Sequence, residues 1–469
     1  MTFLLLQIIT LIWLVALVIA APRAWEAWAW FALALVVRVL VAPPHVLMSW
    51  GYPYQVYLTY MGLLDPSPLY GSGWAAWMSL PRSIVGASPD RVNQLHVVLS
   101  ALVPALLWAT IERATADRTA ARFGALVSTL LPLPIAVGAT ETPLILCAAL
   151  LATALLGLVR ADRVGLTLAT SSAALLAHVR TDQGGVVLLL VAALLVARAW
   201  GLAAAAAVVA ALRVAELMAS SAIPLPVHEL NGIPTVLEYA YGRGSSTTFL
   251  DPWVTPFWLV PLALTGLWAA WRTPGLRALG AICALTLIAG TLPYVGLHRV
   301  TDLARFHLPP QVPACLLAAL AWPVIDKGGW ASRAALAPGL VAGLWIARQP
   351  LGGALVHDVE DARLRAILPT LPTDATVRYD ASRDQHGALR TYVAHRFGVT
   401  MTPWSDQAPL APGELVWRGV GDRWDTPRPT QRCATTSLDL IETPAWDGGL
   451  IYLGPGAVRV GLDRVDSCP

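Results

Sequence analysis

The sequence predicts an all-α polytopic membrane protein of about 12 transmembrane helices, followed by a small α/β domain at its C-terminal end. Composition is the first observation behind this prediction. The 469-residue chain is 56% hydrophobic and only 13% charged, whereas a soluble domain carries roughly 25% charged residues. The second is the distribution of the apolar residues. They form repeated runs of membrane-spanning length that stop near residue 347, where a polar tail begins.

Each apolar run is interpreted as one span, because a helix needs about 17–25 apolar residues to cross the hydrocarbon core. The predicted spans are 3–20, 26–42, 92–111, 123–138, 142–159, 164–178, 185–197, 201–218, 253–271, 278–295, 310–325 and 334–347. The first run ends in "VIAAPRA", similar to a signal-peptide cleavage site, but no basic residue precedes it and Arg23 follows it. We therefore expect an uncleaved span whose N-terminus lies outside.

Basic residues predict the orientation of these spans, because short cytoplasmic loops collect Lys and Arg. The short loops assigned to the inside carry Arg23, Arg113, Arg118, Arg122, Arg160, Arg163, Arg198, Arg272, Arg277, Lys327 and Arg333. The outside segments are much longer and carry only Arg82, Arg91, Arg180, Arg243, Arg299 and Arg305. Both termini are then outside, and the predicted location is multi-pass in a bacterial inner (plasma) membrane with an extracytoplasmic C-terminal domain.

Two domains follow from this layout, a transmembrane domain at 1–350 and an extracytoplasmic α/β domain at 355–469. The transmembrane domain has two long outside loops, at 43–91 and 219–252. The order predicted for the tail is helix 358–368, strand 375–379, helix 385–396 and short strands near 414–418, 437–441 and 449–453.

The five cysteines divide between these two domains. Cys147, Cys283 and Cys315 lie inside apolar runs and are expected to be small buried hydrophobic residues. Cys433 and Cys468 lie in the polar tail and can pair if the tail is in an oxidising compartment, a point that the sequence leaves open.

The outside turn in "LLAHVRTDQGGVVLLL" places His178, Arg180 and Asp182 at the outer membrane surface. A solvated turn with a local ion pair explains these residues equally well, because a turn needs only polar residues and glycine. In the preceding outside turn, "GATETPLIL", Glu141 stands before Pro143. An acid beside a proline is also ordinary chemistry for the beginning of a helix.

A third outside loop, "GLHRVTDLARFHLPPQVP", contains Arg299, Arg305 and His307. Arginine binds phosphate oxygens in a bidentate manner, so this loop suits an anionic headgroup at the membrane. The alternative is that the arginines extend to lipid phosphates without a specific ligand. Acids and cations from three loops thus converge on one membrane face. No cluster of His or Cys residues predicts a metal site.

The stretch from about 90 to 200 resembles the membrane-embedded glycosyltransferases of the GT-C fold, which include protein O-mannosyltransferases and lipid A aminoarabinose transferases. The resemblance rests on "ERATADRTAARFGALVSTLLPLPIAVGATETPLILCAALLATALLGL" and "SSAALLAHVRTDQGGVVLLLVAALL". "DLARFHLPPQVPACLLAALA" is similar to the family's stretch before a late span. The likeness extends in layout over most of 26–348.

The resemblance implies a polyprenyl-phosphate-linked sugar as donor, an envelope glycan, lipid or protein as acceptor, and inverting transfer by a carboxylate base. Glu141 matches the acidic position of the family's second outside turn, and Arg180 and Asp182 match its charged third turn. Arg305 matches the arginine on the phosphate side, with Arg299, His307 and His178 nearby in the same loops. Whether a divalent metal is needed is not implied.

The sequence departs from the family pattern in the first outside loop, where an essential acid is usual. The corresponding place reads "LMSWGYPYQVY", with Trp50 and Gly51 in place of a carboxylate. Asp65, in "LLDPSPLYG", is the first acid of the loop and the candidate for a displaced base, although Asp before Pro is also an ordinary turn.

Two other functions compete with a glycosyltransferase. A transporter or flippase has ionisable groups near the bilayer midplane, and here only Arg213 and Glu216, three apart on one helical face, fit that description. We expect that pair to be structural and to face the bundle interior. A non-catalytic scaffold of envelope assembly with a degenerate GT-C fold is favoured by the missing early acid.

Overall fold

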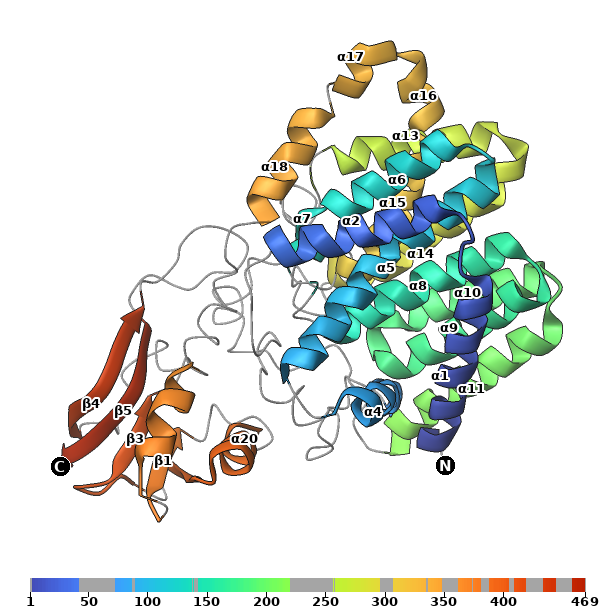
Figure 1. Cartoon of the computed structure of the whole chain (residues 1–469). Helices are drawn as coiled ribbons and strands as arrows, with labels where there is room; N and C mark the ends of the chain where they lie inside the picture. Colours follow the sequence, from blue (N-terminus) through green and yellow to red (C-terminus); the bar gives the residue numbers. More distant parts are fainter. Residues whose placement is uncertain are drawn as a thin grey trace. The chain divides into compact units, whose positions relative to one another are not determined.

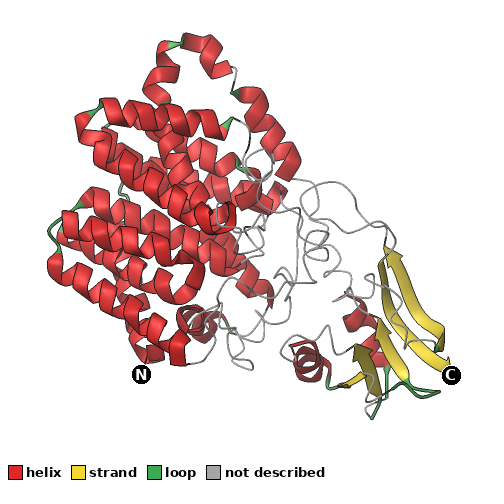
Figure 2. Ribbon diagram, turned by 180° about the vertical axis from the view of Figure 1, so that it is seen from behind, coloured by secondary structure: helices red, strands yellow, loops and turns green. Residues whose placement is uncertain are grey.

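The computed structural model describes residues 2–41, 72–86, 89–136, 138, 142–219, 256, 258–295, 307–334, 336–347, 362–372, 374–380, 388–404, 409–418, 433–443 and 458–468. The chain divides into two compact units. The first comprises Met1–Pro44, Pro66–Pro234 and Gly242–Pro350, and the second comprises His45–Asp65, Thr235–Tyr241 and Leu351–Pro469. The described part of the first unit is helical, and the strands belong to the second (Figure 2).

The helices of the first unit pack side by side (Figure 1). Those before residue 180 are α1 (Thr2–Ala20), α2 (Trp25–Val41), α4 (Ser72–Val85), α5 (Pro89–Thr115), α6 (Arg118–Leu130), α7 (Pro132–Ala136), α8 (Thr142–Arg160) and α9 (Arg163–Val179). The later ones are η1 (Thr181–Gln183), α10 (Gly184–Val196), α11 (Trp200–Ala219), α13 (Leu259–Arg272), η3 (Pro274–Leu276), α14 (Arg277–Val295), α15 (Leu308–Leu320), α16 (Trp322–Lys327), α17 (Gly329–Ala334) and α18 (Ala337–Ala347).

A helix occupies the position of each predicted span. Two of the spans are divided, 123–138 into α6 and α7 and 310–325 into α15 and α16. Proline explains both breaks: the residue before Pro132 is disfavoured in helical conformation, and Pro323 has no N–H to donate to the preceding turn. Pro132 follows Leu131, which is extended with ψ of 131°. Pro323 lies in the first turn of α16.

Six of the described helical segments are long and apolar enough to cross a membrane: Thr2–Ala20, Gln94–Thr115, Pro143–Arg160, Trp200–Met218, Pro274–Thr291 and Leu308–Lys327. The segments of α5, α8 and α15 are mostly buried within the protein, whereas those of α1 and α11 are mostly exposed. Exposed side chains such as Leu4 and Val18 are apolar. An apolar outer surface over a packed helical core is expected when lipid is the solvent.

Helix α15 packs against α13, α14, α8 and α6. Small residues permit the closest of these approaches, as is common between membrane helices. A Cβ atom on Gly266 of α13 would lie 1.6 Å from the carbonyl oxygen of Leu317. One on Gly124 of α6 would lie 2.7 Å from Cβ of Ala319. The C-terminal end of α15 is therefore held closely against α13 and α6.

The second unit contains a five-stranded sheet in the order β2-β1-β3-β5-β4. Its strands are β1 (Thr376–Asp380), β2 (Thr400–Trp404), β3 (Leu415–Arg418), β4 (Ala434–Thr443) and β5 (Val458–Ser467). Strand β1 is parallel to β2 and β3, and β5 is antiparallel to β3 and β4. The sheet and helix α20 (Ala388–Phe397) share a core that includes Val377, Tyr379, Tyr392, Val393 and Trp417.

Several elements of this unit lie where the sequence predicts them. Strands β1, β3 and β4 overlap the predicted strands 375–379, 414–418 and 437–441, and α20 overlaps the predicted helix 385–396. Residues 362–367 are helical, within the predicted helix 358–368. Strands β2 and β5 were not predicted, and the predicted strand 449–453 lies outside the described residues.

Cys433 and Cys468 form a disulfide, which the sequence left open. They flank the residue pair Ala434 and Ser467 and so join the beginning of β4 to the end of β5. Cys147, Cys283 and Cys315 are free and buried, as predicted.

Replacing Cys433 by serine is expected to destabilise the second unit by about 3 kcal/mol, because the bond closes a long loop in the unfolded chain. Hydrogen exchange of the β4 and β5 peptides in the full-length protein measures this effect. Exchange should accelerate on reduction of the wild type and should not respond to reductant in the variant. Equal protection with and without the bond would contradict the prediction.

Candidate functional site

Arg180 and Asp182 form a close ion pair immediately after α9. Nη2 of Arg180 donates to Oδ2 of Asp182 at 2.5 Å, and Nε donates to both oxygens at 3.0 and 3.1 Å. Gln183 Nε2 adds a hydrogen bond to Oδ1 at 3.2 Å. Arg180 is only 5% exposed, so this is a largely desolvated pair and differs from the solvated turn that the sequence also allowed. The carboxylate fixes the direction of the guanidinium.

His178, one turn earlier, is fully buried and bridges two helices. Its Nε2 lies 2.7 Å from the carbonyl oxygen of Val209 in α11. A carbonyl only accepts hydrogen bonds, so Nε2 carries a proton, and Nδ1 is directed to Oγ of Ser72 at 3.3 Å. His178 therefore connects α9 to α11 and to the beginning of α4.

Glu216 completes this network from α11. Its Oε2 accepts hydrogen bonds from Ser72 Oγ and from Arg213 Nη1, both at 3.3 Å. The Arg213–Glu216 pair thus forms as expected from its spacing. Helix α4 docks closely at this point, since a Cβ atom on Gly73 would lie 2.8 Å from the carbonyl carbon of His178. The network attaches the helix that ends the first long loop to α9 and α11.

The Asp182→Asn substitution is expected to cost about 3 kcal/mol of stability, because it removes the charge that balances a nearly buried guanidinium. Asp162→Asn is a matched control, because Asp162 pairs with Arg160, which is also two residues away in the chain. The distance from Arg160 Nη2 to Asp162 Oδ2 is 2.8 Å, and the side chain of Asp162 is 43% exposed. Asparagine also caps α9 as aspartate does, so the control should cost less than about 1 kcal/mol. Thermal unfolding in detergent compares the two, and equal shifts would contradict the prediction.

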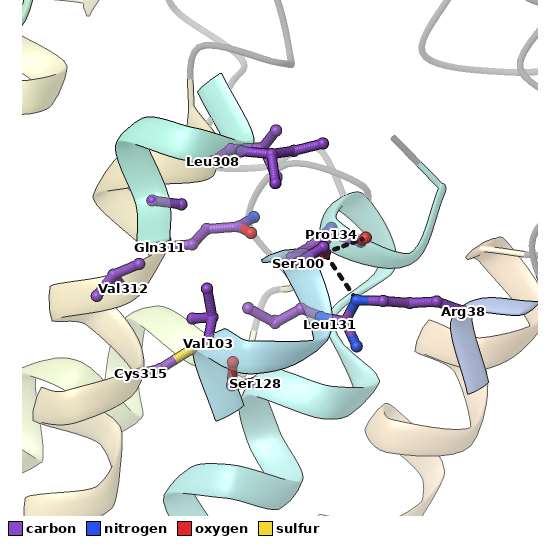
Figure 3. A pocket seen from close by; sticks show the side chains of 12 residues that line it. Arg38, Ser100, Val103, Ser128, Leu131, Pro134, Leu308, Gln311, Val312 and Cys315 are labelled. Carbon is purple, nitrogen blue, oxygen red and sulfur yellow. Dashed lines mark hydrogen bonds between the residues drawn. The ribbon is translucent and has the colours of Figure 1, made fainter. Parts of the chain in front are cut away.

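A pocket lies among α2, α5, α6, α7, α8 and α15. Arg38 and Gln311 extend into it from opposite sides (Figure 3). Arg38 is 3% exposed. Its Nε donates to Ser100 Oγ at 2.7 Å and its Nη1 to the carbonyl oxygen of Ala34 at 3.2 Å. Ser100 Oγ donates in turn to the carbonyl oxygen of Pro134 at 3.3 Å.

A second, apolar pocket lies among α13, α14 and α15. Leu259, Leu264 and Leu287 form much of its wall, and His307 and Gln311 provide polar atoms at the beginning of α15. Gln311 also lines the first pocket, so the two pockets adjoin at this residue. An apolar pocket beside one that contains a buried arginine suits an amphiphilic ligand.

The structure places His178, Arg180, Asp182 and His307 among the described residues, whereas Glu141, Asp65, Arg299 and Arg305 lie outside them. His178 and the Arg180–Asp182 pair adjoin in the chain, and His307 lies at the apolar pocket. The assignment of Asp182 as a catalytic group stays a prediction, and its geometry is that of a residue that orients Arg180. Glu141 lies in the chain between Pro134 and Ile145, both of which line the pocket of Arg38.

The sequence analysis did not single out Arg38, Ser72 or Gln311. A signal for Arg38 was present, because it is the one charge within the apolar run "FALALVVRVLV". An ionisable residue inside a membrane span indicates a functional site. Ser72 and Gln311 carry no comparable signal. Among the described residues there is no group of three His, Cys, Asp or Glu side chains that could hold a metal ion.

No protein-family model and no curated protein matches the sequence. Two solved structures are similar in fold. The crystal structure of ArnT from Cupriavidus metallidurans bound to undecaprenyl phosphate has a TM-score of 0.53 and 15% sequence identity, covering 84% of this chain and 93% of that one. The same protein in the apo state has a TM-score of 0.51 and 14% identity, covering 84% of this chain and 92% of that one.

This likeness confirms the GT-C fold that the sequence predicts. It extends over most of both chains. At 15% identity it shows the fold alone. The chemistry that the pockets support is inferred from the side chains that line them.

Proposed function

We propose that this protein is a membrane glycosyltransferase that moves a sugar from a polyprenyl-phosphate donor to an envelope acceptor at the outer face of the inner membrane. The observation that carries the proposal is a GT-C fold in which an apolar pocket adjoins a pocket lined by a buried arginine. A similar structure is that of ArnT bound to undecaprenyl phosphate. Undecaprenyl phosphate combines a long apolar chain with an anionic group. The apolar pocket suits the first part, and the pocket of Arg38 suits the second.

The apolar pocket is the proposed place for part of the polyprenyl chain. Its walls come from α13, α14 and α15, and Leu259, Leu264 and Leu287 offer methyl groups to the chain. Burial of apolar surface contributes roughly 25 cal/mol per Å². His307 and Gln311 mark the polar end of the pocket, where the phosphate would leave the apolar space.

In the proposed reaction a carboxylate takes the proton of an acceptor hydroxyl. The hydroxyl oxygen then forms a bond to the anomeric carbon, and the bond from that carbon to the phosphate oxygen breaks with inversion. Polyprenyl phosphate leaves with the electron pair of the broken bond. Glu141 is the proposed base, with Asp65 as the second candidate, and Arg299 and Arg305 are the proposed cations for the leaving phosphate.

The cluster after α9 supports this reaction by positioning. Asp182 holds Arg180 in one direction through several hydrogen bonds, so that a cation near the membrane surface is fixed before a ligand arrives. His178 secures α4, the helix that ends the first long loop, through Ser72. We propose that Arg180 contacts the substrate and that Asp182 and His178 keep the site in its reactive arrangement.

The distribution of basic residues supports the proposed outer-face location. The ends of α2 and α6 that are proposed to lie inside carry Glu26, Arg118 and Arg122, which are joined there by salt bridges. Arg38 and Pro134 lie toward the opposite ends of these two helical spans. The pocket of Arg38 is therefore proposed to lie toward the outer face. The disulfide of the second unit supports an extracytoplasmic location for that unit, because disulfides persist in oxidising compartments.

Donor consumption tests this proposal. Purified full-length protein in nanodiscs would be incubated with a panel of polyprenyl-phosphate monosaccharides, and lipid products would be separated by mass. The proposal predicts release of polyprenyl phosphate from at least one donor. Failure to bind or consume any donor would overturn it, and flux of an unchanged lipid-linked sugar across proteoliposomes would instead indicate a flippase.

A further inference from the structure

Arg38 is a buried cation whose charge is not balanced by a nearby carboxylate of the described chain. Its two hydrogen-bond acceptors, Ser100 Oγ and the carbonyl oxygen of Ala34, are both neutral. None of the 12 residues that line its pocket is Asp or Glu. Burial of an isolated charge is costly, so such residues are kept where they bind something or pair with it.

The surroundings of Arg38 are arranged for a negative group. Helix α15 begins at the pocket, with Leu308, Gln311 and Val312 on its wall, and the beginning of a helix carries partial positive charge. Gln311 and Ser128 contribute polar side chains, and the remaining lining is largely apolar. An anion in this pocket would be attracted to Arg38 more strongly than it would be in water, because little water screens the two charges.

Ser100 prevents Arg38 from turning away. It accepts a hydrogen bond from Nε and donates one to Pro134, and so links α2, α5 and α7. This chain of hydrogen bonds uses Nε, the bond to Ala34 uses Nη1, and the guanidinium lines the pocket (Figure 3). A purely structural link between these helices would need only neutral hydrogen-bonding groups, such as Ser100 and the carbonyl oxygen of Pro134, and no buried guanidinium.

We propose that Arg38 binds the phosphate group of a ligand in this pocket, with Gln311 and the N-terminal end of α15 on the opposite wall. The inference deepens the proposed function and rests on it for the source of the phosphate, which is the polyprenyl-phosphate carrier. Free phosphate has the same recognition chemistry and is distinguished by experiment. Arg38 then joins the substrate-binding residues that the loops provide.

Binding measurements on full-length protein in phosphatidylcholine nanodiscs test this assignment. The probes are undecaprenyl phosphate, undecaprenol and inorganic phosphate, with occupancy from native mass spectrometry and thermal unfolding as readouts. Arg38→Gln should weaken undecaprenyl phosphate binding by at least about tenfold, because it removes a charge-assisted contact. Arg38→Lys should be intermediate, since an ammonium keeps the charge without the fork. Undecaprenol should bind equally to all variants.

Arg122→Gln is the matched control, because Arg122 is already paired with Glu26 and does not line the pocket. It should leave undecaprenyl phosphate binding unchanged. Without ligand, Arg38→Gln should unfold at the same or a higher temperature than the wild type, because it removes a buried unbalanced charge. A lower unfolding temperature with unchanged phosphate binding would establish a structural role and overturn the proposal. Val103→Phe, which fills the pocket and keeps Arg38, should also weaken binding.

The remaining outcomes separate this inference from the proposed function. Arg38-dependent binding of undecaprenyl phosphate without consumption of any donor would support the phosphate site and contradict the transferase. Arg38-dependent binding of inorganic phosphate alone would support the site with free phosphate as its ligand. If a donor is consumed but binding of undecaprenyl phosphate does not depend on Arg38, the phosphate site is overturned and the transferase function is supported. Absence of binding by all three probes would overturn the site.

Discussion

Replacing Glu141 by glutamine is expected to lower release of polyprenyl phosphate by about 10²–10⁴-fold, the range of a lost general base. The amide keeps the size of the side chain and its hydrogen bonds but cannot accept the proton of an acceptor hydroxyl. Donor binding should therefore change little, and the loss should appear in kcat more than in KM. Single-turnover measurements with a saturating donor isolate this step.

The same experiment identifies which acid acts as base. Asp65→Asn should reduce turnover by a similar factor only if the displaced acid of the first loop takes that role, because Trp50 and Gly51 leave no carboxylate at the usual place. Glu112→Gln is a control on the proposed inner side and should be neutral. Full activity in both the Glu141 and Asp65 variants would remove the proposed carboxylate chemistry.

The second large effect is expected from Gly266→Ala, which should destabilise the first unit by more than about 4 kcal/mol. The added Cβ would lie 1.6 Å from the carbonyl oxygen of Leu317 and 2.6 Å from its carbon, so the backbones of α13 and α15 must separate. Since these helices form the apolar pocket, donor binding should weaken as well. Yield of monodisperse protein and its unfolding temperature measure the effect.

Gly201→Ala is the matched control, because a Cβ at Gly201 in α11 meets no atom within 4 Å. It should change stability by no more than about 0.5 kcal/mol. Equal yields and unfolding temperatures for the two variants would show that the α13–α15 contact tolerates separation.

The helices at the predicted spans were predictable because each depends on a local property, a run of apolar residues long enough to cross lipid. Helix α4 was not predicted, because it lies within the stretch 43–91 that was interpreted as a loop. The approach of Gly266 to Leu317 was not predictable, since these residues are far apart in the chain and the sequence does not state which helices pack together. Strand β2 was missed because its sequence, "TMTPW", contains a proline and has no apolar alternation. This segment is a strand because it pairs with β1, and its own residues do not indicate a strand.

The candidate site was likewise predictable only where it depends on local sequence and not on packing between helices. The polar turn with Arg180 and Asp182 was found because charges between apolar runs are visible in sequence, whereas the hydrogen bonds of His178 to Ser72 and Val209 depend on packing of α4 and α11. Arg38 was visible as a charge in an apolar run, but its lack of a carboxylate in the pocket appears only in three dimensions. The sequence thus predicted a membrane face and part of the candidate residues, and the structure added the two pockets.

The measurement that tests the central claim most directly is the stoichiometry of sugar transfer. Nanodisc-embedded protein would receive a doubly labelled polyprenyl-phosphate sugar together with an envelope extract as acceptor. We expect one sugar on the acceptor for each polyprenyl phosphate released, with neither product formed by the Glu141→Gln variant. Release of free sugar without transfer, or recovery of the intact donor, would contradict the assignment of this chain as a glycosyltransferase.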